Sequence, residues 1–257
     1  PMERAREYDA TPVSAMSDLF FPPGVLALAI DNGRTHSAGT VRLPPIAGIH
    51  HYAGVDLGFR ENSSTLAIAR NVMRVVRGAD DIPRPVDVAT VVYHEELIAP
   101  VGKPLVPSDV VGGFGRTCQQ YGCASMRGDF HCVDTAIEHL AKLPGNPITY
   151  DAWQPTQERT AATFSRVREL MTEGRISLPN DPRLVSQFKL VLGRKSGGGK
   201  FQVVLPRVGR AHCDLVVSAV TALALAAEGA SNVLAYESSY DHKVDIGMGR
   251  VPVARAQ

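Results

Sequence analysis

The feature that most constrains the fold is an aspartate inside an apolar strand. Residues 51–59 read HYAGVDLGF, and a polar turn then leads into a second apolar run over residues 64–76. This pattern predicts strand, turn and strand, with Asp56 on the first strand. A buried carboxylate is costly unless it is paired with another group or bound to a metal. Asp56 therefore raises the question of which other residues share its surroundings.

The elements that follow have the order of a mixed α/β domain. Residues 86–97 are rich in β-branched residues and predict a third strand, antiparallel to its neighbour. Ser108 and Gly122 are expected to cap the helix that comes next. The predicted helices are residues 107–122, 133–143, 157–174, 181–193 and 211–229, and the later strands are residues 123–129, 147–153 and a hairpin around 194–200. Three antiparallel strands followed by alternating helices and strands predict a ribonuclease H-like fold, with a mixed central sheet flanked by helices.

The chain divides into three regions. Residues 1–47 are punctuated by Pro and Gly and contain one short apolar run, GVLALAI, so we interpret them as a linker or the stub of an upstream domain. Residues 48–235 form the main domain. Residues 236–257 are expected to form a loosely structured tail.

Composition excludes several classes of protein. The 257 residues are 44% hydrophobic and 21% charged, which is ordinary for a globular domain. No apolar run reaches the roughly 18 residues of a membrane span, so no membrane partner is expected. The four cysteines show no C-x-x-C spacing, which argues against a zinc site and favours free thiols in a reducing compartment.

Charge is unevenly distributed along the chain. Residues 159–210 contain 11 Lys or Arg and 3 acids, a charge of +8, while the remainder carries −7. This asymmetry indicates a surface that faces a polyanion, although a solvated helix face with a basic loop would give the same count.

Three acids occupy related positions in the predicted fold. Asp56 lies on the first strand, Asp129 ends the fourth, and Asp214 begins the last helix. If they converge, they cannot all remain ionised unless a cation neutralises them. Such oxygen-rich sites suit Mg²⁺ or Mn²⁺, and two such ions can hydrolyse a phosphodiester. We therefore predict that these three acids are metal ligands and catalytic residues.

Each acid also has a simpler interpretation, and other candidates exist. Asp129 could cap the following helix, and Asp214 could favour the positive end of its own helix. Asp151, which also follows a strand, is the main rival to Asp129. Asn62 could contact a metal-bound water, or it could be an ordinary turn residue. His212 could orient water or phosphate, or it could be a packing residue. The glycine-rich stretch GRKSGGGKF lacks the spacing of an ATP-binding loop, so no ATPase motif is visible.

Several stretches together resemble one family. They are GVDLGFRENSSTLAIAR, SMRGDFHCVDTAIEHL, RVRELMTEGRISLP with RLVSQFKLV, and LPRVGRAHCDLVVSAVTALALA. They are similar to the C-terminal nuclease domain of the tailed-phage terminase large subunit, over about residues 48–230. The family often has HDDL where this chain has HCDL, with Cys213 in the middle, and often has an acid where Asn62 stands.

The resemblance implies a function and a set of partners. It implies a Mg²⁺- or Mn²⁺-dependent endonuclease that uses two ions to cut concatemeric double-stranded DNA during genome packaging, leaving a 3′-hydroxyl and a 5′-phosphate. The metal ligands that it implies are Asp56, Asp129 and Asp214. The implied partners are an upstream ATPase domain, the portal and the small terminase subunit, and the implied location is the host cytoplasm.

Other functions of the same fold stay open. A transposase or resolvase of the ribonuclease H-like class would share the acids, and a catalytically silent domain would only bind DNA or the portal. The RKSGGGK hairpin is the predicted DNA-binding element, because three glycines allow its tip to approach a phosphate surface closely. The predicted DNA-binding residues are Arg194, Lys195, Lys200 and Arg207.

Overall fold

A computed structural model gives the architecture of the chain. It describes residues 19–35, 41–60, 62–77, 83–195, 201–206 and 213–229. The strands are β1 (Ile30–Thr35), β2 (His51–Asp56), β3 (Ser64–Arg77), β4 (Pro83–Leu97), β5 (Ser125–Asp129), β6 (Thr149–Trp153), β7 (Ile176–Asn180), β8 (Leu192–Lys195) and β9 (Phe201–Val204). The helices are α3 (Pro23–Ala29), α4 (Pro107–Tyr121), α5 (Val133–Leu140), α6 (Gln157–Thr172), α7 (Pro182–Leu190) and α8 (Asp214–Glu228), with a 3₁₀ turn, η1 (Phe130–Cys132).

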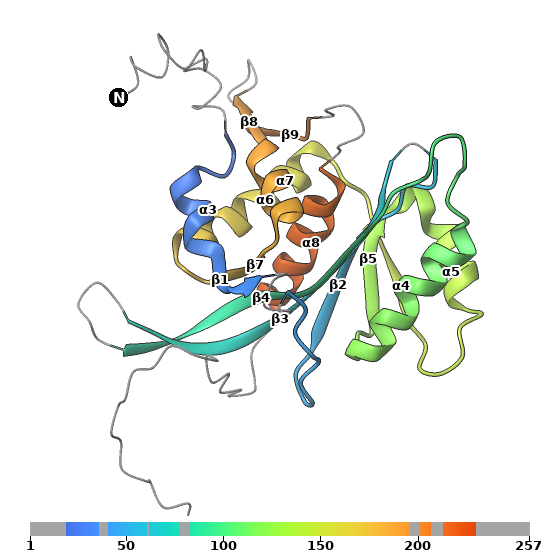
Figure 1. Ribbon diagram of the computed structural model, residues 1–257, viewed down its shortest axis with the longest axis horizontal. Coiled ribbons are helices and arrows are strands. Elements are labelled where there is room, and N and C mark those ends of the chain that lie inside the picture. Colours follow the sequence, from blue (N-terminus) through green and yellow to red (C-terminus); the bar gives the residue numbers. More distant parts are fainter. Residues whose placement is uncertain are drawn as a thin grey trace, which may run out of the picture.

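Seven strands form one mixed sheet in the order β1-β7-β4-β3-β2-β5-β6 (Figure 1). The predicted meander is present, because β2, β3 and β4 pair antiparallel in chain order. The strands β5 and β6 then add in parallel beyond β2, each reached through a helix. The sheet therefore has the mixed character that the element order predicted.

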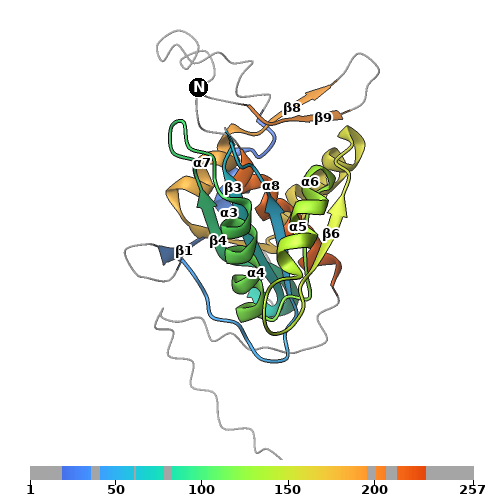
Figure 2. The same cartoon turned by 90° about the vertical axis from the view of Figure 1, so that its right-hand side faces the viewer.

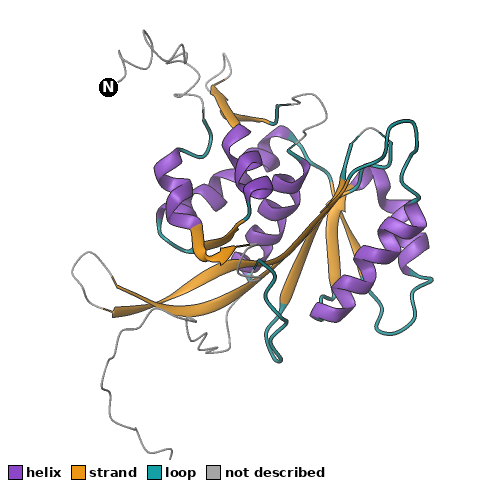
Figure 3. Cartoon of the chain, viewed as in Figure 1, coloured by secondary structure: helices purple, strands orange, loops and turns teal. Residues whose placement is uncertain are grey.

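Helices cover both faces of the sheet (Figure 3). Because successive side chains of a strand point to opposite faces of the sheet, the core is divided into two clusters, one on each face. On β3, Ala67 and Ala69 face the cluster that includes α3, α6, α7 and α8. Leu66 and Ile68 face the cluster that includes α4. The buried helix predicted at the end of the domain is α8, whose residues are buried almost all round and which packs across β2, β3 and β4.

Part of the predicted linker belongs to the packed domain. Helix α3 and strand β1 lie within residues 1–47, and β1 pairs in parallel with β7 at the edge of the sheet. Phe20 and Phe21 before them are buried in the core, and Phe21 contacts Phe188 of α7 with ring centroids 5.1 Å apart. Residues 1–18 and the predicted tail at 236–257 lie outside the described residues.

The predicted caps of α4 are half right. Gly122 ends the helix in the left-handed conformation, with φ 67°, and its amide bonds back to the last turn. The N-cap residue is Val106 rather than Ser108, which is the second residue of the helix and contacts Asp109. Pro107 starts the helix instead, because its missing amide and fixed φ suit the first position.

The predicted hairpin is a separate two-stranded ribbon. Strands β8 and β9 pair antiparallel, from Leu192 opposite Val204 to Lys195 opposite Phe201. Two views at right angles place this ribbon beyond the ends of the helices, at one end of the molecule (Figures 1 and 2). Across the described residues, no helix is both long and apolar enough to cross a membrane.

Candidate active site

Two of the predicted acids meet at one edge of the sheet. Asp56 is the last residue of β2, and Asp129 is the last residue of β5. These strands are parallel, with Gly54 opposite Arg127, and continuing that register by two residues brings Asp129 opposite Asp56. Asp129 also accepts a hydrogen bond of 3.0 Å from the amide of His131, so it caps the η1 turn as well. Both interpretations of this residue therefore fit its position.

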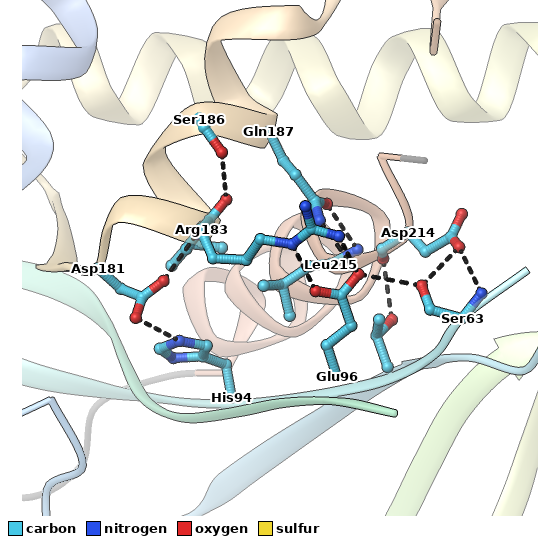
Figure 4. A network of polar contacts seen from close by, with 11 residues as sticks. Ser63, His94, Glu96, Asp181, Arg183, Ser186, Gln187, Asp214 and Leu215 are labelled. Atoms are coloured by element: carbon cyan, nitrogen blue, oxygen red, sulfur yellow. Dashed lines mark hydrogen bonds and ion pairs between the residues drawn. The ribbon is translucent and has the colours of Figure 1, made fainter. Parts of the chain in front are cut away.

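The third acid reaches this edge from α8. The Oδ2 atom of Asp214 accepts hydrogen bonds from the hydroxyl of Ser63 at 2.8 Å and from its amide at 3.2 Å (Figure 4). The hydroxyl of Thr65 donates to the Asp214 carbonyl at 2.9 Å. Thr65 is the cross-strand partner of Asp56. These bonds fix the start of α8 beside the end of β2.

The electrostatics of Asp56 show that the three acids influence one another. The residue keeps some solvent exposure, but its carboxyl lies among many protein atoms. Burial and, to a smaller extent, the charges of Asp214 and then Asp129 together raise the pKa of Asp56 to about 7. The structure thus brings together the acids that the sequence singled out, from three distant points in the chain.

The rival acid has a different partner. Asp151 lies on β6, and its Oδ2 is 2.7 Å from both Nε and a terminal nitrogen of Arg127. A carboxylate held by a guanidinium fork is less available to a metal. The acids that raise the pKa of Asp56 are Asp214 and Asp129. The geometry therefore favours Asp129 over Asp151 as the second acid of the cluster.

The turn between β2 and β3 is held firmly beside the acids. The hydroxyl of Ser64 donates to the carbonyl of Gly58 at 2.6 Å and accepts from its amide at 3.2 Å. A Cβ on Gly58 would lie 2.6 Å from the Cβ of Asn62, so the turn requires glycine there. Asn62 is thus packed into the turn, and His212 lies outside the described residues.

A polar network behind Asp214 was not foreseen. The Glu96 carboxylate accepts from Nε of Arg183 at 2.7 Å and from its terminal nitrogen at 2.9 Å (Figure 4). Glu96 also lies 3.1 Å from the Ser63 hydroxyl, which therefore sits between two carboxylates. Gln187 contacts Glu96 at 3.4 Å and accepts from the amide of Leu215 at 3.0 Å. The network ties β4 and α7 to the first turn of α8.

A sequence signal for this network existed. The third strand ends in HEEL, where three polar residues in a row follow the apolar run VVY. Glu96 pairs with Thr65 across β3 and β4, so it stands in the same row as Asp56. Arg183 and Gln187 are four residues apart and share one face of α7.

The donor chemistry of the edge fits a hard divalent cation. Carboxylate oxygens are the ligands that Mg²⁺ and Mn²⁺ prefer. Among the residues described, no three His, Cys, Asp or Glu side chains are grouped closely enough to hold a metal ion. The acids would therefore have to draw closer around a bound ion. The raised pKa of Asp56 supports the fit, because a bound cation would stabilise the ionised carboxylate against both burial and the charges of Asp214 and Asp129.

The predicted DNA-binding residues are only partly visible. Arg194 is exposed on β8. Lys195 ends β8, and nothing further is described for its side chain. Lys200 and Arg207 lie outside the described residues. Their contacts with DNA stay a prediction.

Comparison with known proteins identifies the fold. The sequence matches no family model and no curated protein. The structure matches the large terminase nuclease from thermophilic phage G20c with a TM-score of 0.56 and 18% identity, over 82% of this chain and 98% of that one. The same nuclease with bound magnesium matches with a TM-score of 0.55 and 18% identity, over 80% and 96% of the two chains.

A larger solved structure gives a similar match. The HK97 bacteriophage large terminase matches with a TM-score of 0.57 and 15% identity, over 80% of this chain and 43% of that one. At these identities the comparison establishes the fold. The predicted ribonuclease H-like class, with its mixed sheet and flanking helices, is therefore confirmed as the fold of the phage large terminase nucleases.

Proposed function

We propose that this chain is a metal-dependent DNA endonuclease that cuts concatemeric viral DNA during genome packaging. The observation that carries the proposal is the convergence of three acids at one edge of the sheet, where burial and then the charges of Asp214 and Asp129 raise the pKa of Asp56 to about 7. The fold supports it, since the solved structures that match are nucleases and one of them holds magnesium.

In this proposal Asp56, Asp129 and Asp214 hold Mg²⁺ or Mn²⁺, as two ions. When bound, such ions activate the attacking water and stabilise the leaving oxygen, which gives a 3′-hydroxyl and a 5′-phosphate. The rest of the chain positions the carboxylates. Ser63 fixes one oxygen of Asp214 with two hydrogen bonds, and Glu96 limits the rotation of the Ser63 hydroxyl.

Double-stranded DNA is the proposed substrate, and the β8–β9 hairpin its proposed contact. The hairpin leads along the chain to the start of α8, and Arg194 is exposed on it. Phosphate contacts of this kind give affinity without reading sequence. An ATPase domain, the portal and the small terminase subunit are the proposed partners. The match to 43% of the HK97 protein is consistent with a larger molecule of which this fold is one part.

The acids provide the decisive experiment. Plasmid cleavage with Mn²⁺ is measured for wild type and for Asp56→Asn, Asp129→Asn and Asp214→Asn, each with a melting curve to verify folding. We expect each variant to lose more than the roughly 100-fold that is typical of losing an outer-shell partner. The matched control is Asp151→Asn, which removes a carboxylate tied to Arg127 and should retain cleavage.

Two outcomes would change the proposal. Full activity in Asp129→Asn together with loss in Asp151→Asn would move the second acid to β6. A folded wild type that binds DNA but does not cut it with Mn²⁺ or Mg²⁺ would identify a silent DNA-binding module. That alternative draws on the absence of a closely grouped ligand set among the described residues.

A further inference from the structure

A basic hollow lies beside the turn that follows β2 and plays no part in the site described above. It has a volume of ≈ 450 Å³ and is lined by Arg60, Gly102, Lys103 and Pro104. One wall is the turn that follows β2, four residues after Asp56. The other wall is the loop between β4 and α4. Two segments far apart in the chain thus form one open depression.

The two walls are fixed to each other and to the sheet. The amide of Leu105 donates to the carbonyl of Phe59 at 2.7 Å, which joins the loops directly. The amide of Lys103 closes a turn onto Pro100 at 3.1 Å, and Gly102 adopts φ 72°, which favours glycine. The hollow therefore has a defined shape beside the end of β2.

The charge in the hollow is positive, and no described residue compensates it. Arg60 and Lys103 are both exposed, and neither side chain makes a hydrogen bond or ion pair with another described residue. Other exposed cations differ, since Lys142 pairs with Glu138 and Arg183 with Glu96. Cations left without a protein acceptor, in a preformed hollow, are suited to phosphate oxygens.

The position of the hollow indicates that the phosphate belongs to the backbone of DNA. The loop after β4 and the β8–β9 hairpin lie at the same end of the molecule, on different sides of the edge that carries the acids (Figures 1 and 2). A duplex long enough to touch the hairpin and cross the acids would reach the hollow. We propose that Arg60 and Lys103 form a second backbone-phosphate subsite, which holds DNA on the side of the acids away from the hairpin. This inference rests on the proposed nuclease function.

Salt-dependent DNA binding tests the subsite directly. Binding of a short mixed-sequence duplex is measured in EDTA, which prevents cutting, over a series of salt concentrations. Each lost phosphate contact lowers the slope of log affinity against log salt by about 0.9. The double variant Arg60→Ala, Lys103→Ala should therefore lose about 1.8 of slope, with lower affinity at every salt concentration.

Two further variants isolate the effect. Arg116→Ala with Lys142→Ala removes the same charge from exposed positions on α4 and just after α5, and should leave the slope unchanged. Arg60→Lys with Lys103→Arg keeps both charges and should retain the wild-type slope. An Ala variant with the wild-type slope, or a control pair that lowers the slope equally, overturns the subsite alone. A wild type that binds no duplex overturns the nuclease proposal and the subsite with it.

Discussion

At the scale of single residues, the site is built from groups that repel one another. Asp56, Asp129 and Asp214 come from two strand ends and a helix start. The fold keeps them near each other at a cost, because burial and two neighbouring charges disfavour the ionised form of Asp56. Residues at functional sites commonly trade stability for activity in this way.

The pKa of Asp56 predicts how stability depends on pH. In the folded chain the pKa of Asp56 is about 7, whereas the ordinary pKa of an aspartate carboxyl is 3.8. Between these values the folded state binds more protons than the unfolded state, so stability falls as pH rises, by at most about 4 kcal/mol. Asp56→Asn removes this loss. In EDTA, we expect the variant to raise the melting temperature at pH 8 and to have little effect at pH 4.

Two comparisons make that measurement specific. Asp151→Asn changes a carboxylate that faces Arg127, so its effect on the melting temperature should not follow the same pH course. Adding Mg²⁺ at pH 8 should stabilise the wild type more than Asp56→Asn, since a bound cation offsets the repulsion. An equal shift for Asp56→Asn at pH 4 and pH 8 would contradict the assigned pKa.

The positions of the acids could be predicted from the sequence, but the pairing of residues in the network beside them could not. Asp56, Asp129 and Asp214 each sit at a recognisable element boundary, where a polar residue interrupts an apolar pattern. Glu96 and Arg183 are 87 residues apart, and their pairing depends on how α7 packs against the end of β4. Pattern and spacing carry no information about such packing.

At the scale of elements, sequence periodicity correctly predicted those helices and strands that local preferences determine. The β2–β4 meander and helices α4 to α8 follow strand and helix periodicities that the sequence displays. Strand β7 was not predicted, because it is only five residues long, ISLPN, and contains a proline. The pair α3 and β1 was assigned to a linker, since β1 owes its strand form to pairing with β7. Both misses are cases where distant partners override local preference.

The crossing of β2 and α8 makes a sharp stability prediction. A Cβ on Gly54 would clash with the carbonyl of Ser218 and lie 2.8 Å from the amide of Ala222, both backbone atoms of α8. Overpacking against backbone cannot be relieved by a rotamer change, so Gly54→Ala should cost about 3 kcal/mol or more. That corresponds to a fall of roughly 6–12 °C in melting temperature for a chain of this size.

Another glycine provides the control. Gly113 lies inside α4, and a Cβ there would meet nothing within 4 Å. Gly113→Ala should therefore stabilise the protein by about 0.5–1 kcal/mol, the usual gain from replacing glycine in a helix. A well-tolerated Gly54→Ala would mean that α8 does not approach β2 as closely as described.

The hairpin can be tested separately from the hollow. The triple variant Arg194→Ala, Lys195→Ala, Lys200→Ala should lower the salt slope of duplex binding in EDTA by about 2.7, if all three contact phosphates. An unchanged slope and affinity would remove the hairpin from the DNA surface. The cations of α6, such as Arg159 and Arg166, would then be the better candidates for the +8 segment.

At the scale of the whole molecule, the chain has a nuclease fold, and no ATPase motif is visible in its sequence. The glycine-rich stretch before β9 lacks the spacing of a phosphate-binding loop. The purified chain should therefore neither bind nor hydrolyse ATP. ATP hydrolysis is measured as phosphate release in the presence of plasmid DNA and Mg²⁺. A rate above that of buffer alone would contradict our division between a nuclease domain and an ATPase domain.

The hydrogen bond between Ser63 and Asp214 has a consequence for the order of events during translation. Its two partners are 151 residues apart, and the second of them begins the last helix. At a synthesis rate of about 5–20 residues per second, roughly 8–30 s separate their appearance. Once Asp129 has been added, and until Asp214 follows, the nascent chain contains two of the three acids and lacks the third. Under the proposed function, cutting activity would thus appear only once the last helix has docked, and an incomplete product of translation would be harmless to nearby DNA.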